Sequence, residues 1–361
     1  MCKKPKNPPQ PRKCTTYSSK RRWLVTDRYA TQVILPQLSE QGQKKLATSY
    51  VVLIGCGAIG TVIASALARA GIGRIKVIDK DSVEYHDLVQ HALFEEDDVK
   101  NQLPKAIATA RHLRRINSSI EVTGILADVN QSNIEQLIAG ADLVVAGMND
   151  NETCFLINDA CMKHKISWVH GKAVGTWGTI LDIIPGQTPC YQCVFGSPLT
   201  HERIYTTKNV GLFSGVSSTI GCLQFTEAIK MLVGAEEINR RLLTVDVWKG
   251  TFHHLRVHHR SGCLACAGKF EFLSGKSLAK ATRPCDGGRA VEVLSPVVRS
   301  ISLPDLALRL SPHGQVKYNE FMLRFTTDSH EIVVFPDGRA IFKNTSDESL
   351  ALKLYAKYIG G

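Results

Sequence analysis

A short apolar run leads into a glycine-rich loop and then into an alanine-rich helix, and this succession restricts the possible folds more than any other feature. Residues 51–54 are Val-Val-Leu-Ile, and the loop 55–60 is Gly-Cys-Gly-Ala-Ile-Gly. In the pattern GxGxxG, backbone amides and the start of the helix cradle phosphate groups. An acid at the end of the next strand then binds ribose hydroxyls. We therefore expect an adenosine nucleotide at Gly55, Gly57, Gly60 and Asp79, although this pattern alone does not distinguish ATP from NAD or FAD.

Helical and strand-like segments alternate after the loop. The sequence predicts a helix over 26–48, strands over 51–54, 73–79, 120–127 and 142–147, and helices over 61–71, 104–117 and 133–139. This βαβαβ order predicts a Rossmann-like, doubly wound α/β fold with a mostly parallel sheet and helices on both faces. From Trp168 onward, short strands, a helix over 217–233 and a hairpin over 242–259 predict an antiparallel extension.

Two CxxC pairs lie about seventy residues apart in the second half of this region. They are Cys190-Tyr-Gln-Cys193 and Cys263-Leu-Ala-Cys266. Two tight turns that each supply two sulfurs match a tetrahedral zinc site, and sites made only of thiolates are usually structural. We therefore predict a structural Zn²⁺ held by Cys190, Cys193, Cys263 and Cys266.

Charge and cysteine content restrict the cellular setting. The chain of 361 residues has a net charge of +11, and residues 1–22 carry eight basic and no acidic side chains. Without aromatic interleaving or a recognition helix, the sequence favours a solvated, disordered arm over a nucleic-acid contact. Eleven cysteines, an odd number without a disulfide-like framework, fit a reducing compartment. With no apolar run of eighteen residues and no signal-like start, we expect a cytoplasmic protein that does not enter a membrane.

The composition changes after Gly268, which suggests a second unit. We expect a basic arm over 1–22, a nucleotide-binding domain over 23–268 and a small α+β module over 269–361. The clearest part of this module is a hairpin over 332–342 with an Asp-Gly turn. A last helix with Thr345 and Glu348 as its capping residues closes the module.

Several short motifs together resemble one family. They are Arg28-Tyr-Ala-Thr-Gln32, Gly71-Ile-Gly-Arg74, Ile78-Asp-Lys-Asp-Ser-Val-Glu84, Leu103-Pro-Lys-Ala106, Ala141-Asp-Leu143, Asn158-Asp-Ala-Cys161 and Pro189-Cys-Tyr-Gln-Cys193. The chain resembles the ThiF/MoeB/HesA superfamily, which includes ubiquitin-activating enzymes and the adenylyltransferases of sulfur carrier proteins. The resemblance covers residues 28–266 and extends into the C-terminal module.

This resemblance implies a reaction, a metal and partners. In the family, the C-terminal Gly-Gly carboxylate of a small carrier protein attacks the α-phosphorus of ATP, giving an acyl-adenylate and pyrophosphate. It implies that Asp79 and Asp81 lie beside the nucleotide, that Lys105 contacts the phosphates, and that a carboxylate binds Mg²⁺. It also implies a homodimer whose partner is a carrier protein or peptide ending in Gly-Gly.

The chain departs from the family pattern where the chemistry is expected. Thr31 and Gln90 stand where the family has phosphate-binding arginines, and the family's metal-binding aspartate aligns with Asn149. Asp150, one residue later, or Asp87 could bind Mg²⁺ instead, and His86, His91 and Lys100 are local basic replacements. Because arginine's fixed bidentate charge is lost, a non-catalytic scaffold that presents a peptide or carrier to a partner enzyme stays open as the alternative. An NAD-dependent oxidoreductase shares only the glycine loop.

Cysteines and the C-terminal glycines are the remaining candidates for covalent roles. No cysteine lies between Cys193 and Cys222, and Cys222 falls in an apolar helix where a packed side chain is expected. Adenylation without a covalent cysteine step is therefore favoured, with Cys154 and Cys285 as the outside candidates. The final Gly360-Gly361 resembles a carrier tail, but the preceding helix does not resemble a ubiquitin-like fold.

Overall fold

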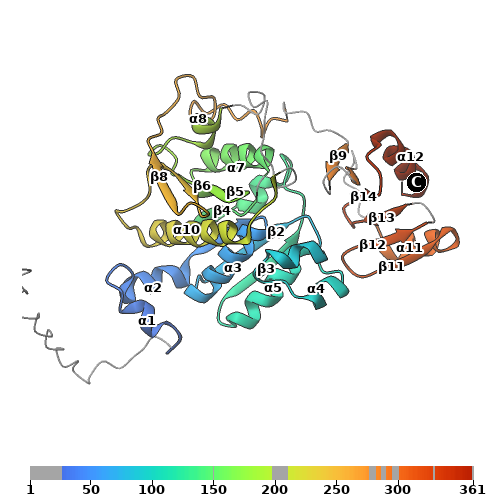
Figure 1. Ribbon diagram of the computed structural model, residues 1–361, viewed down its shortest axis with the longest axis horizontal. Helices are drawn as coiled ribbons and strands as arrows, with labels where there is room; N and C mark the ends of the chain where they lie inside the picture. Colours follow the sequence, from blue (N-terminus) through green and yellow to red (C-terminus); the bar gives the residue numbers. More distant parts are fainter. Residues whose placement is uncertain are drawn as a thin grey trace, which may run out of the picture.

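The computed structural model describes residues 27–148, 150–196, 210–275, 282–285, 290–294, 301–327 and 330–359. The predicted arm over 1–22, Asn149, and the Gly360-Gly361 terminus lie outside the described residues. Two sheets organise this part of the chain, each with its own helices (Figure 1). In the described ranges, no helix has both the length and the apolar character needed to cross a membrane.

The first sheet has eight strands in the order β3-β2-β1-β4-β5-β6-β7-β8. Their bounds are β1 Tyr50–Ile54, β2 Arg74–Asp79, β3 Glu121–Leu126, β4 Leu143–Ala146, β5 Ser167–Val174, β6 Trp177–Ile183, β7 Leu242–Asp246 and β8 Thr251–Leu255. Neighbours from β3 to β5 pair in parallel, whereas β5 to β8 pair antiparallel. The order 3-2-1-4 is that of a doubly wound nucleotide-binding fold, so the expected fold class with its antiparallel extension is confirmed.

Helices cover both faces of the parallel strands. The bounds of the larger helices are α3 Ala58–Ala70, α5 Lys105–Ile116, α6 Ile134–Ile138, α7 Asn151–His164 and α10 Ser214–Val233. Successive strand residues point to opposite faces, so Val51 and Leu53 pack with α3, α5 and α10, whereas Val52 and Ile54 pack with α6 and α7. Both sets are fully buried, which explains why the strands are apolar along their whole length.

The N-terminal segment differs from the continuous helix predicted over 26–48. It forms η1 Asp27–Tyr29, α1 Ala30–Val33 and α2 Ser39–Thr48, with a break between them. Pro36 lies in this break, and a proline inside a helix removes a backbone donor and clashes with the preceding turn. Shorter helices elsewhere are η2 Tyr85–Val89, α4 Glu96–Lys100 and α8 Tyr191–Phe195.

The second sheet is antiparallel, in the order β11-β12-β13-β14-β10-β9. Its elements are β9 Thr282–Cys285, β10 Ala290–Val293, α11 Leu303–Leu310, η5 Ser311–His313, β11 Gln315–Tyr318, β12 Leu323–Thr326, β13 Glu331–Val334, β14 Ala340–Lys343 and α12 Glu348–Tyr358. β13 and β14 form the predicted hairpin. The predicted cap of the last helix is wrong, because Asp347 accepts hydrogen bonds from the backbone N–H groups of Ser349 and Leu350.

A buried ion triad joins the second sheet to the first. Glu292 on β10 is 1% exposed, and its two carboxylate oxygens accept from Lys80 Nζ at 2.6 Å and from the Arg339 guanidinium at 2.8 Å. Arg339 also donates to the backbone carbonyl of Lys80 and stacks over the Phe335 ring at 3.9 Å. Lys80 directly follows β2, so this triad fixes the second sheet against the end of that strand.

Replacing Glu292→Gln should destabilise the protein strongly, because it leaves the buried Arg339 and the partly exposed Lys80 without their counter-charge. Loss of a buried ionic partner costs about 3–5 kcal/mol, which should appear as a lower denaturant midpoint. The matched control is Glu320→Gln, whose exposed carboxylate lies 4.0 Å from Arg111 and whose loss should cost about 0–1 kcal/mol. Equal midpoints for the two variants would contradict a stabilising triad.

The same triad should make stability depend on pH. Burial by itself would raise the pKa of Glu292, but the charges of Lys80 and Arg339 lower it below its ordinary value of 4.5. A lowered carboxyl pKa contributes stability that is present above the ordinary value and is lost as the pH falls toward the lowered pKa. The denaturant midpoints of wild type and Glu292→Gln should therefore differ fully above about pH 4.5, the ordinary pKa, and approach each other as the pH falls below this value.

Candidate functional site

The glycine loop forms a tight bend between β1 and α3. Gly55 has φ +93°, a left-handed conformation that residues with a side chain rarely adopt. A Cβ at Gly60 would lie 2.0 Å from the carbonyl oxygen of Gly55, so only glycine allows the first turn of α3 to pack against the loop. Gly60 therefore serves packing, whereas Gly55 and Gly57 line a cavity.

Gly57 leaves room for a ligand at the start of α3. It is the N-cap residue of this helix, and the nearest atoms to a Cβ there would be 3.8 Å and 4.0 Å away. A Cβ at Gly57 would clash with nothing, so packing does not require a glycine at this position. The absence of a side chain instead leaves the backbone at the start of α3 accessible from the cavity that Gly57 lines. Free amides at the start of a helix bind anions, as the phosphate prediction requires.

Asp79 ends β2 and holds the loop from the other side. Its Oδ2 accepts from the backbone N–H of Cys56 at 2.6 Å, and its Oδ1 accepts from that of Asp81 at 2.8 Å. Burial and then the negative charge of Asp81 raise the pKa of Asp79 above its ordinary value. Each carboxylate oxygen can accept a further hydrogen bond, so Asp79 is able to bind hydroxyl donors in the cavity that it lines.

Lys105 is the first residue of α5 and points into the same cavity. Its Nζ donates to Asp87 Oδ1 at 3.1 Å, and its backbone N–H donates to the carbonyl of Asp81 at 2.8 Å. Burial opposes its charge, but the carboxylates of Asp81 and Asp87 outweigh this and raise the pKa of Lys105 above its ordinary value. Lys105 is therefore a permanently charged group, already partly neutralised by Asp87.

Residues from both sheets line this cavity, which has a volume of about 980 Å³. Its charged lining includes eight carboxylates but only four lysine or arginine side chains. The carboxylates are Asp79, Asp81, Glu84, Asp87, Asp128, Asp150, Glu152 and Glu292, and the cations are Lys80, Lys105, Arg324 and Lys343. A polyphosphate would therefore need added positive charge to bind here.

Asp150 and Asp87, the two expected Mg²⁺ carboxylates, both line the cavity but differ in setting. Asp150 is exposed and caps α7, where its Oδ2 accepts from Thr153 N at 2.8 Å and from the Thr153 hydroxyl. Asp87 is buried, close to the charge of Lys105, and its Oδ2 accepts from the backbone N–H of Glu84. Carboxylate oxygens at the cavity wall are suitable Mg²⁺ ligands, and Asp150 is the more accessible of the two.

The residues that replace the family's arginines lie in different places. Gln90 lines the cavity, whereas Thr31 is exposed on α1 outside the cavity lining. Of the basic replacements, His86 lines the cavity, and its hydrogen bond with Glu84 raises its pKa. Burial lowers the pKa of His91 to about 4, so this ring is neutral near pH 7.

Lys100 does not replace the arginines either. Its side chain is half exposed on α4, pairs with Glu96 and Asp97, and lies outside the cavity lining. Among the described residues, His86 is therefore the one of these three basic side chains that lines the cavity.

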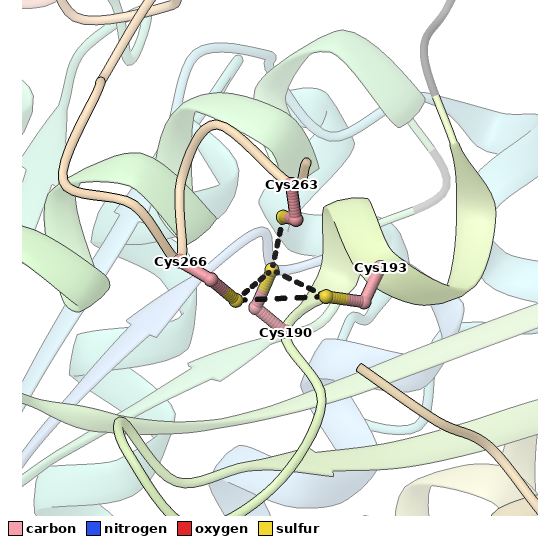
Figure 2. A group of neighbouring side chains, drawn as sticks. All are labelled: Cys190, Cys193, Cys263 and Cys266. Carbon is pink, nitrogen blue, oxygen red and sulfur yellow. Dashed lines mark hydrogen bonds between the residues drawn. The ribbon is translucent and has the colours of Figure 1, made fainter. Parts of the chain in front are cut away.

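The four cysteines converge as the sequence predicts (Figure 2). All four Sγ atoms lie within 4.8 Å of one another, and four of their separations are 3.5 to 3.7 Å. Four thiolates around Zn²⁺ at about 2.3 Å form a tetrahedron with edges of about 3.8 Å. The described geometry therefore fits a closed, structural zinc site.

Helix α7 supports both cysteine turns and the cavity. Asn158 Oδ1 accepts from the backbone N–H of Tyr191, within the first CxxC, at 2.9 Å. Asp159 Oδ2 accepts from the N–H of Phe272, beyond the second CxxC, at 2.9 Å. Phe272 stacks on Phe155 and lines the cavity, so α7 connects the cysteine site to the nucleotide cavity.

The remaining cysteines do not form a covalent centre in the described residues. Cys154 is buried, and burial raises its pKa to about 12, so its thiol is not reactive near pH 7. Cys222 is exposed on α10, contrary to the expectation of a packed side chain, because it lies on the side of the helix away from the sheet. The side chain of Cys285 lies outside the described residues.

One wall of the cavity was not predicted from the sequence. It is made by strand residues of the second sheet and by two residues that flank its strands: Glu292, Arg324, Val333, Ile341 and Lys343 lie on strands, whereas Met322 precedes β12 and Phe335 follows β13. No local motif marks them. Asp128, which follows β3 and also lines the cavity, could have been found, because ligands bind at the carboxyl ends of parallel strands.

Comparison with known proteins gives a consistent picture. The ThiF family matches residues 29–265. The "Sulfur carrier protein ThiS adenylyltransferase" of Bacillus subtilis is 36% identical over 93% of this chain and all of its own length. The "SAMP-activating enzyme E1" of Haloferax volcanii is 32% identical over 66% of this chain and 88% of its own. The crystal structure of E. coli MccB with ATP superposes with a TM-score of 0.58 and 25% identity, over 67% of this chain and 75% of MccB.

Zinc analysis tests the cysteine site directly. Protein purified without added metal should contain about one zinc per chain, and Cys263→Ser should lower both the zinc content and the unfolding midpoint, because a structural metal contributes to folding. The matched control is Cys222→Ser, an exposed cysteine outside the cluster, which should retain metal and stability. Metal-free wild-type protein with four reactive thiols would contradict the assignment.

Proposed function

This chain belongs to the ThiF family, and we propose that it is an ATP-dependent adenylyltransferase that activates the C-terminal carboxylate of a small ubiquitin-like carrier protein or peptide ending in Gly-Gly. A carboxylate oxygen would attack the α-phosphorus, the bond to the β-phosphate oxygen would break, and pyrophosphate would leave. The observation that carries the proposal is the convergence of the glycine loop, Asp79 and Lys105 on one cavity.

Each of these groups has a defined part in such a reaction. The loop amides at Gly55 and Gly57 would hold phosphate oxygens, and Asp79 would accept from the ribose hydroxyls. Lys105 would neutralise charge on the phosphates as the leaving group departs, which is how fixed cations stabilise phosphoryl transfer. The carrier's carboxylate would then need only to be held in line with the breaking bond.

A divalent metal is the natural source of the missing positive charge. The excess of carboxylates around the cavity disfavours a bare polyphosphate, and Mg²⁺ held at these carboxylates would supply the positive charge that the polyphosphate needs. We assign Asp150 as its first protein ligand, because this carboxylate is exposed to the cavity at the start of α7. Asp87 is assigned mainly to orienting Lys105, with which it is paired.

One specific observation keeps the non-catalytic scaffold as a second candidate. Lys105 is paired with Asp87, and Gln90 and Thr31 stand where the family pattern has two arginines. The cavity thus has fewer free cations than adenylation chemistry normally uses. A scaffold would retain the fold and the zinc site without this charge.

We also propose a homodimer with the two domains expected from the sequence. Exposed apolar side chains lie together before α10 and on the β7–β8 hairpin: Phe213 and Trp248 are in edge-to-face contact, and these two and Phe252 are all at least 47% exposed. Such a patch is larger than isolated surface apolar residues and marks an interaction surface.

The domain limits 23–268 and 269–361 fit the two sheets, and a cytoplasmic setting would keep the four zinc ligands reduced.

ATP–pyrophosphate exchange with Gly-Gly carriers tests the proposed activity. Lys105→Met should lower the exchange rate about 10²–10³-fold, the usual cost of one stabilising charge. Lys100→Met removes an exposed lysine outside the cavity and should leave the rate unchanged. Tight Mg·ATP binding without exchange for any carrier tested would favour the scaffold over the enzyme.

Restoring charge should improve a site that is short of cations. Gln90→Arg together with Thr31→Arg should increase the exchange rate, since one arginine on a transferring phosphoryl group contributes several kcal/mol. Residue 31 lies outside its own cavity, so its arginine would act across the proposed dimer, as the family resemblance implies. The single variants Gln90→Arg and Gln131→Arg form a matched pair, because each adds one positive charge to a different part of the cavity lining. An equal increase in both proteins would point to a general electrostatic effect and not to the two family positions.

A further inference from the structure

The second sheet has one face that packs on its own helices and one that lines the cavity. Residues of β14 show the alternation: Ala340 and Phe342 lie in the core formed with α11 and α12, whereas Ile341 and Lys343 line the cavity. On β13, Val333 lines the cavity, and it pairs directly with Ile341 across the hairpin. Neighbouring strands therefore place an apolar strip, Val333 and Ile341, on the cavity face.

This strip lies at one particular end of the cavity. Met322, Val333 and Phe335 form a buried cluster against which Leu126, the last residue of β3, packs. The residues that follow β3, 127–131, line the same cavity. The strip therefore covers the end of the cavity beside β3, away from the glycine loop between β1 and α3.

Ion pairs hold the strip in place on two sides. On one side, Glu292 binds Lys80 at 2.6 Å in the buried triad. On the other side, Lys343 Nζ donates to Glu84 Oε1 at 3.0 Å, next to η2. Because both contacts join the second sheet to residues that follow β2, Ile341 has a fixed position relative to Asp79.

The order of groups across the first sheet indicates what this wall would contact. Phosphates belong at the loop after β1, and the ribose belongs at Asp79 at the end of β2. The next position outward is the end of β3, where the base of the nucleotide would lie. A purine ring has flat, weakly polar faces, and burying them against apolar side chains is more favourable than leaving them in water.

We propose that the second sheet forms the wall of the base subsite, with Ile341 and Val333 packing against the purine ring of ATP. This inference rests on the proposed function, because it takes ATP as the ligand. It assigns the recognition of the base to the C-terminal module. The glycine loop and Asp79 contact only the phosphates and the ribose. Ile341 is the residue to vary, because it is half-buried and lines the cavity.

The test compares a ligand that has a base with one that lacks it. Calorimetry should show that Ile341→Trp, which fills the subsite, raises the Kd of Mg·ATP by at least about tenfold, or about 1.4 kcal/mol. The Kd of Mg·tripolyphosphate should change less than about twofold, because this ligand occupies only the phosphate end. Leu308→Trp, at a position of α11 that is 76% exposed, adds the same ring to the same module outside the cavity and should change neither Kd.

Each other outcome has a distinct meaning. If wild-type protein does not bind Mg·ATP, the proposed function itself is wrong. If wild type binds Mg·ATP and Ile341→Trp binds it equally well, only the base wall is wrong. If Ile341→Trp weakens the binding of Mg·ATP and of Mg·tripolyphosphate to the same extent, the base wall is also wrong. Should Ile341→Trp fail to fold, Ile341→Ala replaces it, and it must weaken Mg·ATP while leaving tripolyphosphate binding intact.

Discussion

The close contact between the glycine loop and the start of α3 is the constraint on which the nucleotide cavity depends. Because no side chain fits at Gly60, the helix begins directly above the end of β1 and presents its first amides to the cavity. Asp79 secures the same loop through the Cys56 N–H, so the end of β2 is placed relative to the end of β1. Lys105 and Asp81 are joined to this frame by a backbone hydrogen bond, and the chemical groups therefore share one rigid support.

The balance of positive and negative charge in the cavity determines which ligands it can bind. The buried Asp87 keeps Lys105 ionised and in place, but it also neutralises part of the lysine's charge. An asparagine at residue 87 would orient the lysine without neutralising it, so the aspartate makes the cavity more dependent on an external cation. The chain thus combines a nucleotide-binding geometry with a cavity that is lined by more carboxylates than cations.

Local patterns predicted the first sheet and the cysteine cluster, because each depends on residues near one another in the sequence or on a metal's fixed geometry. The local pattern predicted Gly55 and Asp79, and the family resemblance implied Lys105; all three line the cavity. The wall containing Ile341 and Lys343 was not predicted, because it comes from packing between two sheets, held by Glu292 and Lys80 more than two hundred residues apart. The break at Pro36 could have been predicted, because a proline inside a helical pattern is itself a local breaking signal. The cap at Asp347 was missed because Thr345 and Glu348 offered an equally good local signal.

A cavity shared between distant segments has a consequence for protein synthesis. Chains generally fold from the N-terminus as they leave the ribosome. The glycine loop, Asp79 and Lys105 emerge early, and the first sheet can close as soon as β8 is made. Residues 341 and 343 follow almost ninety residues later. A nascent chain therefore passes through a stage with an assembled phosphate cradle that is open on one side, and chaperones or nucleotides present during translation meet this unfinished cavity first.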